Sequence, residues 1–411
     1  MLKKIAMTAA LAVLLAACGK TESEAITFRD RNLLAGQLNA GVVDATNTFG
    51  LALAQRVIAE KPGSNVSLSP ISVMQALAMT MNGASGGTKE AMARTLRLEG
   101  MPMDELNEGE RSLTRLLEDA GPGIKLSVAN SLWLQQGWPF RSSYKDAVSK
   151  SYAAELQERN LPAPAVRKEI NKWVSKKTGG KIPTIVDDPV SASTKLMLIN
   201  ALYFNAAWTN PFKAENTKDG TFSSADGTKR QVGMMHQEGR FEYDEENEYQ
   251  ALRLPYGDGQ MGMLIVLPRP DADRKALMNK LFTDPAWWER RFESYGGDLA
   301  LPKFHVDATL GLEEALSAMG MENAFDKHKA DFSEMADSSG EPLYINRVLH
   351  KTQVTVSEKG TEAAAATVVE MKAGSAPPNG RFTMTVDRPF WFAIQDLQTN
   401  ALLFVGAVEK L

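Results

Sequence analysis

The sequence predicts an α+β fold in one large domain, and three observations lead to this prediction. Helical spacing of apolar residues comes mostly early in the 411-residue chain, whereas strand patterns dominate from Phe241 onward. This order differs from the alternation of strands and helices that predicts a parallel sheet. Hydrophobic residues make up 44% of the chain and charged residues 23%, as in globular proteins with a large core. No internal repeat or linker-like stretch divides the sequence.

The first residues are expected to carry the chain out of the cytoplasm. Two lysines precede an uncharged apolar run from Ile5 to Leu15. This pattern is typical of a secretory signal, and the run is too short for a membrane span of about 20 residues. The run ends in Leu-Ala-Ala before Cys18, which resembles the bacterial lipoprotein box. We therefore predict a lipoprotein signal peptide over residues 1–17.

The only cysteine of the chain, Cys18, lies directly after this motif. The resemblance implies a lipid on Cys18 that holds the protein to a bacterial membrane, on the periplasmic or outer side. In a Gram-negative source, Gly19 would favour the outer membrane or cell surface. An unlipidated signal with an incidental cysteine is the alternative. Small polar residues follow, so residues 18–40 are expected to form a flexible tether before a folded domain over residues 41–411.

Helices are predicted where apolar residues recur every three or four positions. The second of them has the clearest start, because Ser69 can cap it and Pro70 suits the first helical position. The predicted helices are Val43–Ala59, Pro70–Met81, Lys89–Leu98, Met103–Ala120 and Val166–Lys177.

Strands are predicted where apolar residues form short runs or alternate with polar ones. The run Lys195–Phe204 is apolar throughout, which indicates a strand buried on both faces. The other predicted strands are Leu126–Leu134, Gln250–Pro255, Met261–Pro268, Leu299–Val306, Val348–Val356, Phe382–Val386, Phe390–Ile394 and Ala401–Val408.

Composition excludes several classes of protein. A single cysteine rules out disulfides within the chain and cysteine-rich metal sites, and the four histidines are too scattered to predict a metal site. A net charge of −4 with interspersed signs argues against a nucleic-acid-binding protein. We expect a monomer without a cofactor.

Three short motifs resemble catalytic signatures in the wrong context. Gly83–Gly87 matches G-x-S-x-G, but a helix precedes it where that motif needs a strand. Gly257–Gly262 matches G-x-G-x-x-G, but a strand follows it, so a hairpin turn is predicted. Ser142–Lys145 matches S-x-x-K without its partner motifs. We therefore predict that the chain is not an enzyme.

Residues 358–380 differ in kind from the rest of the sequence. They begin with a glycine and small residues, end near two prolines and lie between two strand patterns. At a spacing of two, Glu362 and Glu370 fall on one face, and the other face is uncharged: Thr361, Ala363, Ala365, Thr367 and Val369. Such a segment could enter a sheet without burying a charge. A surface helix is the alternative, because alanine and glutamate favour helix.

Ordered motifs across the chain resemble those of one family, the serpins. The run Glu358-Lys359-Gly360-Thr361-Glu362-Ala363-Ala364-Ala365-Ala366 matches the hinge of inhibitory serpins. Further matches are Asn65–Ser72, Gly83–Thr88, Asn171–Val174, Thr178–Ile182, Met234–Gln237, Gly239–Phe241, Leu254–Tyr256 and Val386–Phe390. The resemblance implies a large central β-sheet, smaller sheets, about nine helices and an exposed reactive-centre loop at about residues 358–380.

The resemblance also implies roles for particular residues. Four of them should form a hydrogen-bonded cluster beneath the main sheet, called the shutter: Ser69, Ser72, Asn200 and His350. Lys303 and Glu358 should meet near Trp208 at the top of the sheet, called the breach, where the loop enters. The hinge that enters would comprise Glu358, Gly360, Thr361, Glu362, Ala363, Ala364, Ala365 and Ala366.

The function implied by this resemblance is inhibition of a serine or cysteine protease as a suicide substrate. The protease would cut the loop, the loop would insert as a strand, and the protease would stay covalently trapped. Counting along the loop from Glu358 places the reactive bond at Gly374–Ser375. A loop one residue shorter gives Ala373–Gly374, and Lys372–Ala373 would suit a trypsin-like enzyme. A non-inhibitory serpin that acts as a binding or structural protein is the alternative.

Overall fold

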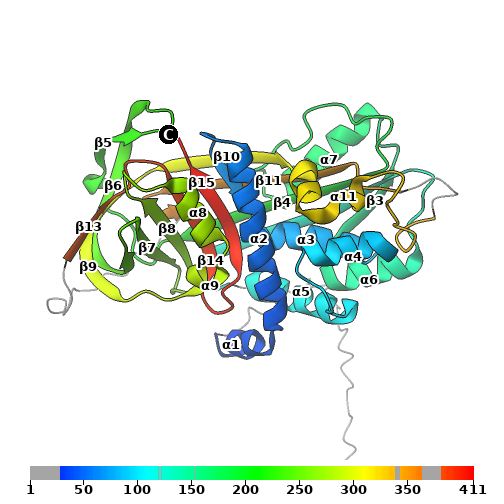
Figure 1. The fold of residues 1–411 in the computed structure, drawn as a ribbon, viewed down its shortest axis with the longest axis horizontal. Coiled ribbons are helices and arrows are strands. Elements are labelled where there is room, and N and C mark those ends of the chain that lie inside the picture. The colour runs from blue at the N-terminus through cyan, green and yellow to red at the C-terminus, as the bar shows by residue number, and fades with distance from the viewer. Residues whose placement is uncertain (1–27, 119, 122, 153, 338–342, 363–380) are drawn as a thin grey trace, which may run out of the picture.

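The computed structural model describes residues 28–118, 120–121, 123–152, 154–337, 343–362 and 381–411 (Figure 1). Its α-helices are α1 (Phe28–Gln37), α2 (Ala40–Glu60), α3 (Pro70–Met81), α4 (Gly86–Thr95), α5 (Met103–Glu118), α6 (Ser142–Tyr152), α7 (Pro164–Lys177), α8 (Arg274–Phe282), α9 (Pro285–Glu289), α10 (Glu313–Leu316) and α11 (Glu322–Phe325). A 3₁₀ turn, η1, covers Ala214–Asn216, and a π turn, η2, covers Ser317–Met321.

The strands form two sheets. They are β1 (Val66–Leu68), β2 (Ile124–Gln135), β3 (Glu155–Arg159), β4 (Leu196–Ala207), β5 (Lys218–Ser223), β6 (Lys229–Glu245), β7 (Tyr249–Tyr256), β8 (Met261–Pro268), β9 (Ser294–Pro302), β10 (Phe304–Gly311), β11 (Arg347–Ser357), β12 (Gly360–Thr361), β13 (Arg381–Thr385), β14 (Phe390–Asp396) and β15 (Leu402–Val408). One sheet has the order β1-β15-β14-β8-β7-β6-β9-β13, with β5 paired to β6. The other has the order β10-β11-β12-β4-β2-β3.

The six-stranded sheet is buried on both faces, and this explains its apolar central strand. On one face, Ile170 and Val174 of α7 pack in the same cluster as Ile199 of β4. On the other face, Leu77 of α3 belongs to the main core together with Leu198. A strand covered on both sides cannot alternate apolar and polar residues, so the run in β4 is apolar almost throughout. Figure 1 shows β3 toward the right, β4 and β11 in the middle and β5, β6 and β13 at the left.

The α+β class is confirmed, as are most of the predicted elements. Ser69 does cap α3, since its hydroxyl accepts a hydrogen bond from the Ser72 amide, and Pro70 is the first helical residue. The predicted strand Leu299–Val306 is wrong as a single element. The chain changes sheets at Lys303: β9 pairs with β6, whereas β10 pairs with β11. Sequence periodicity cannot reveal this change, because both pieces have the pattern of a strand.

The tether predicted over residues 18–40 differs from the structure in its last part, where α1 lies. Arg31 of α1 is 1% exposed, and its guanidinium pairs with buried Asp396 at 2.5 Å. A buried ion pair fixes this segment to the end of β14, so residues before 40 already pack against the folded domain. Within the described ranges, no helix combines the length and the apolar character needed to cross a membrane.

Candidate functional site

The neighbouring strands β4 and β11 are joined along only part of their length. They pair directly and in parallel from Met197 and Arg347 to Tyr203 and Gln353. Beyond that point the short strand β12 lies between them. The chain therefore folds back after β11 and places the hinge residues Gly360 and Thr361 between the separated strand ends.

Only glycine fits at the start of β12. Gly360 has φ +142°, and a Cβ there would lie 2.1 Å from the Ala206 carbonyl oxygen. The following residue, Thr361, is fully buried, and its hydroxyl hydrogen-bonds to the Tyr256 hydroxyl at 2.5 Å. The sheet therefore accepts the hinge through a bare backbone followed by one small, inward-facing side chain.

Lys303, Glu358 and Trp208 lie together around this turn. The Lys303 ammonium lies 3.3 Å from the Glu358 carboxylate, which also accepts a hydrogen bond from the Thr217 hydroxyl at 2.9 Å. Partial burial alone would raise the pKa of Glu358, but donors from its own backbone, Thr217 and Lys303 bring that pKa below its usual value. Trp208 stacks on Tyr256 at 4.3 Å and donates its indole N–H to the Ser357 carbonyl.

The four predicted shutter residues also come together, further along the same two strands, where β4 and β11 pair directly. His350 of β11 is fully buried, and its Nε2 accepts a hydrogen bond from the Ser69 amide at 2.9 Å. Its Nδ1 pairs with the Asn200 side-chain oxygen of β4. The Asn200 amide group then donates to the Ser72 carbonyl at 3.0 Å. The cluster thus joins β4 and β11 to the start of α3.

His350 is held neutral and in one tautomer. Burial lowers the pKa of His350 to about 3, because the charged ring would lose its hydration. Since Nε2 accepts from a backbone N–H, the proton must sit on Nδ1 and be donated to Asn200. The neutral ring can therefore accept a hydrogen bond from the Ser69 amide and donate one to the Asn200 side chain.

The cluster extends to residues that the sequence analysis missed. Asn200 donates to Asn130 of β2, which donates to Gln75 of α3 at 3.1 Å, which in turn donates to Thr114 of α5 at 2.6 Å. Fully buried Glu110 lies one turn before Thr114 on the same helix. Asn130 could have been suspected from the sequence, because it is a polar residue within an apolar strand pattern.

Several predicted residues lie outside the described part of the chain. They are Cys18, Ala363, Ala364, Ala365, Ala366, Lys372, Ala373, Gly374 and Ser375. Of the catalytic look-alikes, Gly257–Gly262 forms the connection between the antiparallel strands β7 and β8, as predicted for a hairpin. Ser85 directly precedes the first residue of α4 and follows a helix, so it is not on a strand-to-helix elbow.

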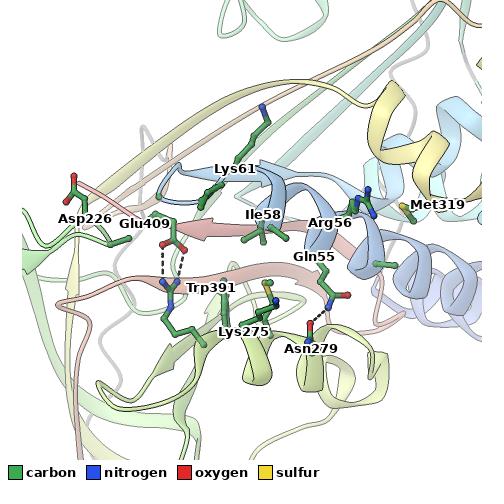
Figure 2. Close-up of a pocket in the computed structure, with 17 residues that line it drawn as sticks. Gln55, Arg56, Ile58, Lys61, Asp226, Lys275, Asn279, Met319, Trp391 and Glu409 are labelled. Carbon is green, nitrogen blue, oxygen red and sulfur yellow. Dashed lines mark hydrogen bonds and ion pairs between the residues drawn. The ribbon is translucent and has the colours of Figure 1, made fainter.

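A cavity of about 820 Å³ lies between α2 and α8 (Figure 2). Its floor is apolar, with Ile58 and Trp391, and it is crossed by a hydrogen bond from Gln55 to Asn279 and by the ion pair of Arg274 with Glu409 at 2.6 Å. None of the predicted hinge, breach or shutter residues lines this cavity. These side chains therefore join α2, α8 and the chain end after β15.

The whole arrangement, a sheet whose strands β4 and β11 separate at one end around the returning hinge, agrees with the sequence comparison. Residues 44–411 match the family model described as Serpin (serine protease inhibitor). The chain belongs to the serpin family. Serpins as a family are protease inhibitors rather than catalysts, and a protease is the partner that family membership implies.

Similar proteins support the same assignment. The chain is 38% identical to an uncharacterized serpin-like protein of Thermococcus kodakarensis, over 89% of this chain and 84% of that one. It is 32% identical to leukocyte elastase inhibitor A of Mus musculus, over 89% and 98%. The crystal structure of tengpin, a thermophilic serpin in its native state, aligns with a TM-score of 0.82 at 30% identity, over 90% of this chain and 94% of that chain.

Proposed function

We propose that this serpin inhibits a serine protease as a suicide substrate, and a cysteine protease by the same acyl-enzyme chemistry. The protease attacks one bond in the loop of residues 358–380 and becomes an acyl-enzyme on the new carboxyl end. The freed arm then inserts between β4 and β11 and carries the protease with it. One observation carries the proposal: β12 already lies between the ends of these two strands, paired to both.

The pairing of β12 fixes where an inserting strand would go. Thr361 lies opposite Val356 on one side and Ala206 on the other. Because β12 is antiparallel to both strands, each later hinge residue would lie opposite the preceding residue of each strand. Continued in this way, Thr367 falls opposite His350 and Asn200. An inserting strand would thus bring a hydroxyl to the shutter cluster, where it can replace contacts that separation of β4 and β11 disturbs.

The same register sorts the loop into two faces. Residues directly opposite each other share a face, and Val356, Val354, Thr352, His350 and Val348 of β11 are all buried. The inward-facing loop residues would therefore be the uncharged set from Thr361 to Val369. Glu370 would face outward and lie opposite Arg347. This sorting supports insertion, because an unpaired carboxylate on the inner face would cost several kcal/mol.

Insertion would release energy that the uncleaved chain stores. The arm would gain on the order of ten ladder hydrogen bonds, each contributing roughly 0.5–1.5 kcal/mol net. The uncleaved form is then held by a kinetic barrier rather than by its own minimum. In this register residue 371 would lie opposite Leu196, the first residue of β4, where that strand ends. A reactive bond at Gly374–Ser375 would then leave three residues between the sheet and the protease.

The experiment mixes residues 19–411 with pancreatic elastase, subtilisin and trypsin, followed by denaturing gel electrophoresis. Small residues at Gly374–Ser375 or Ala373–Gly374 predict a complex with the first two enzymes, and cleavage after Lys372 predicts one with trypsin. The name of the mouse relative, an elastase inhibitor, makes elastase the first choice. Mass spectrometry of the released peptide identifies the bond. Clean cleavage without an SDS-stable band, also with papain-like enzymes, contradicts inhibition and favours a binding or structural serpin.

Attachment to a membrane through Cys18 is a separate proposal that rests on the signal pattern of residues 1–18. A lipidated chain expressed in a bacterium partitions into detergent and incorporates labelled palmitate. The Cys18→Ser variant should do neither. Labelling that survives this substitution would show that the lipid, if any, is elsewhere.

A further inference from the structure

Glu362 is the last hinge residue that the structure describes, and we propose that Lys181 is a latch that holds this residue at the end of the six-stranded sheet. The inference deepens the proposed function and rests on it, since it concerns what sets the start of insertion. Lys181 follows α7, far from the loop in sequence, and its ammonium lies 3.3 Å from the Glu362 carboxylate. The pair joins the segment that covers the outer face of the sheet to the hinge itself.

The backbone of Glu362 is only partly paired with the neighbouring strands. Its amide donates to the Thr355 carbonyl at 2.9 Å, so it has gained one more ladder bond on β11. Its own carbonyl accepts a hydrogen bond from the Asn205 side chain rather than from a strand. Its φ is +52°, a left-handed value that is unusual for a residue with a side chain. An inserted strand needs a negative, extended φ here, so this residue must change conformation before the next can pair.

Contacts with Lys181 and Thr355 hold the Glu362 side chain in its present position. Its side chain is only 6% exposed, although it carries a charge. Lys181 contributes the ion pair, and the Thr355 hydroxyl donates to the same carboxylate at 3.4 Å. A change of φ from left-handed to extended redirects the Cα–Cβ bond, so the carboxylate leaves its present position when insertion resumes. The contacts therefore stabilise the present position and are broken on the way forward.

The position of Lys181 is set by the end of α7. Gly180 N–H bonds to the Ser175 carbonyl at 2.7 Å and Gly179 N–H to the Lys176 carbonyl at 3.3 Å, the pattern of a Schellman motif. The first glycine has φ +60° and the second +82°. The next residue after Lys181, Ile182, is fully buried, which fixes the segment to the core. Lys181 is thus held by its neighbours at the point where Glu362 emerges.

A cavity of about 560 Å³ lies beside the pair, which lines it. The segment after α7 forms one wall, and the outward-facing side of β11 forms the other, through Lys351 and Gln353. In the continued register these two residues face Ala366 and Ala364, so the cavity marks the path of the next hinge residues. Lys351 is itself paired with Asp307 at 3.4 Å. Of the two lysines that line this cavity, Lys181 is therefore the one that pairs with the Glu362 carboxylate.

The first experiment needs no protease. Purified chains are held at a temperature at which the wild type converts within hours to an uncleaved form that resists unfolding in urea. Removal of the pair should lower the barrier, so Lys181→Gln should convert about three to five times faster, as expected for a partly exposed ion pair. Lys181→Arg should stay near the wild-type rate. Lys172→Gln is the matched control, because Lys172 is an exposed lysine of α7 with no ion pair among the described residues.

Exchanging the charges of Lys181 and Glu362 distinguishes loss of this ion pair from general destabilisation of the fold. Lys181→Glu and Glu362→Lys should each speed conversion, and the double variant should return toward the wild-type rate, because opposite charges face each other again. Rates for Lys181→Gln within twofold of the wild type and of Lys172→Gln would overturn the proposal. So would loss of the native form by unfolding at lower temperature, without a urea-resistant product.

The second experiment uses a protease that forms the SDS-stable complex, and measures moles of serpin consumed per mole of enzyme. Faster insertion competes better with hydrolysis of the acyl-enzyme, so Lys181→Gln should lower this ratio relative to Lys172→Gln. The two proposals fail in different ways. An absent covalent complex contradicts inhibition, whereas an unchanged conversion rate contradicts the latch alone.

Discussion

The two sheets of this serpin are held by different kinds of contact. In the nine-stranded sheet, β14 and β15 are buried along their whole length, and Phe392 packs against Phe304 and close to Gly406. In the six-stranded sheet, β4 and β11 meet through Asn200 and His350, within a chain of directional hydrogen bonds. Apolar packing is lost when strands separate, whereas polar groups can be satisfied again by a new strand. The seam that would have to open therefore contains a polar cluster within apolar surroundings, whereas β14 and β15 pack through apolar side chains.

The largest effect is expected from a charge on the inner face of the loop. Ala365→Glu would place a carboxylate opposite Thr352 and Leu202, where its burial would cost several kcal/mol. The variant should be cut by the protease but form no SDS-stable complex, with unchanged stability before cleavage. Ala364→Glu is the matched control, because that residue faces outward in the same register. Equal loss of inhibition in both variants would break the assignment of faces.

A cavity in the nine-stranded sheet should lower the stability of the chain and leave inhibition almost unchanged, which is the opposite of the result expected for Ala365→Glu. Phe392→Ala removes a fully buried ring, and we expect a loss of about 3–5 kcal/mol in the free energy of unfolding. The number of serpin molecules consumed per protease should change little, because this sheet does not take part in insertion. Urea unfolding and inhibition assays on the same preparation check both parts. A large change in that ratio would mean that the two sheets are coupled.

The polar network should give an effect of intermediate size that depends on pH. Burial raises the pKa of Glu110 to about 8, opposed in part by the neighbouring Gln75 amide. A raised carboxyl pKa means that the folded chain binds more protons than the unfolded one, so stability falls as pH rises from about 4.5 to 8. Glu110→Gln should remove this decline and stabilise the chain by about 3 kcal/mol at pH 7. Parallel stability curves for both chains between pH 5 and 8 would contradict this.

The smallest effect is expected at the breach. Lys303 is 47% exposed, so its pair with Glu358 should contribute less than about 1 kcal/mol. Lys303→Gln should therefore lower stability only slightly, and high salt should reduce the difference, since it screens exposed pairs. Unfolding in urea at low and high salt measures this. A loss well above 1 kcal/mol would show that the breach stabilises the seam more than its exposure suggests.

The sequence could predict those parts of the site that local pattern controls. Ser69 and Pro70 predicted the start of α3, and the apolar run Lys195–Phe204 predicted β4. The two faces of the loop stay a prediction, because residues 363–380 lie outside the described part of the chain. The sequence could not predict that Leu299–Val306 divides between two sheets, nor that α1 lies within the expected tether. The extension of the shutter through Asn130, Gln75 and Thr114 was also missed. Each of these features depends on which elements pack together in the folded chain. The spacing of apolar residues along the sequence does not specify this packing.

By itself the sequence determined the fold class, the polar and apolar faces and, through its motifs, the family. Tertiary structure alone decided which side chains meet. Ser69 and His350 are separated by 281 residues and still share a hydrogen bond, and Lys181 reaches Glu362 only because α7 ends where the hinge emerges. Local spacing sets the direction in which a side chain points. Which partner the side chain contacts depends on the pairing and packing of segments that are distant in the sequence and become buried together.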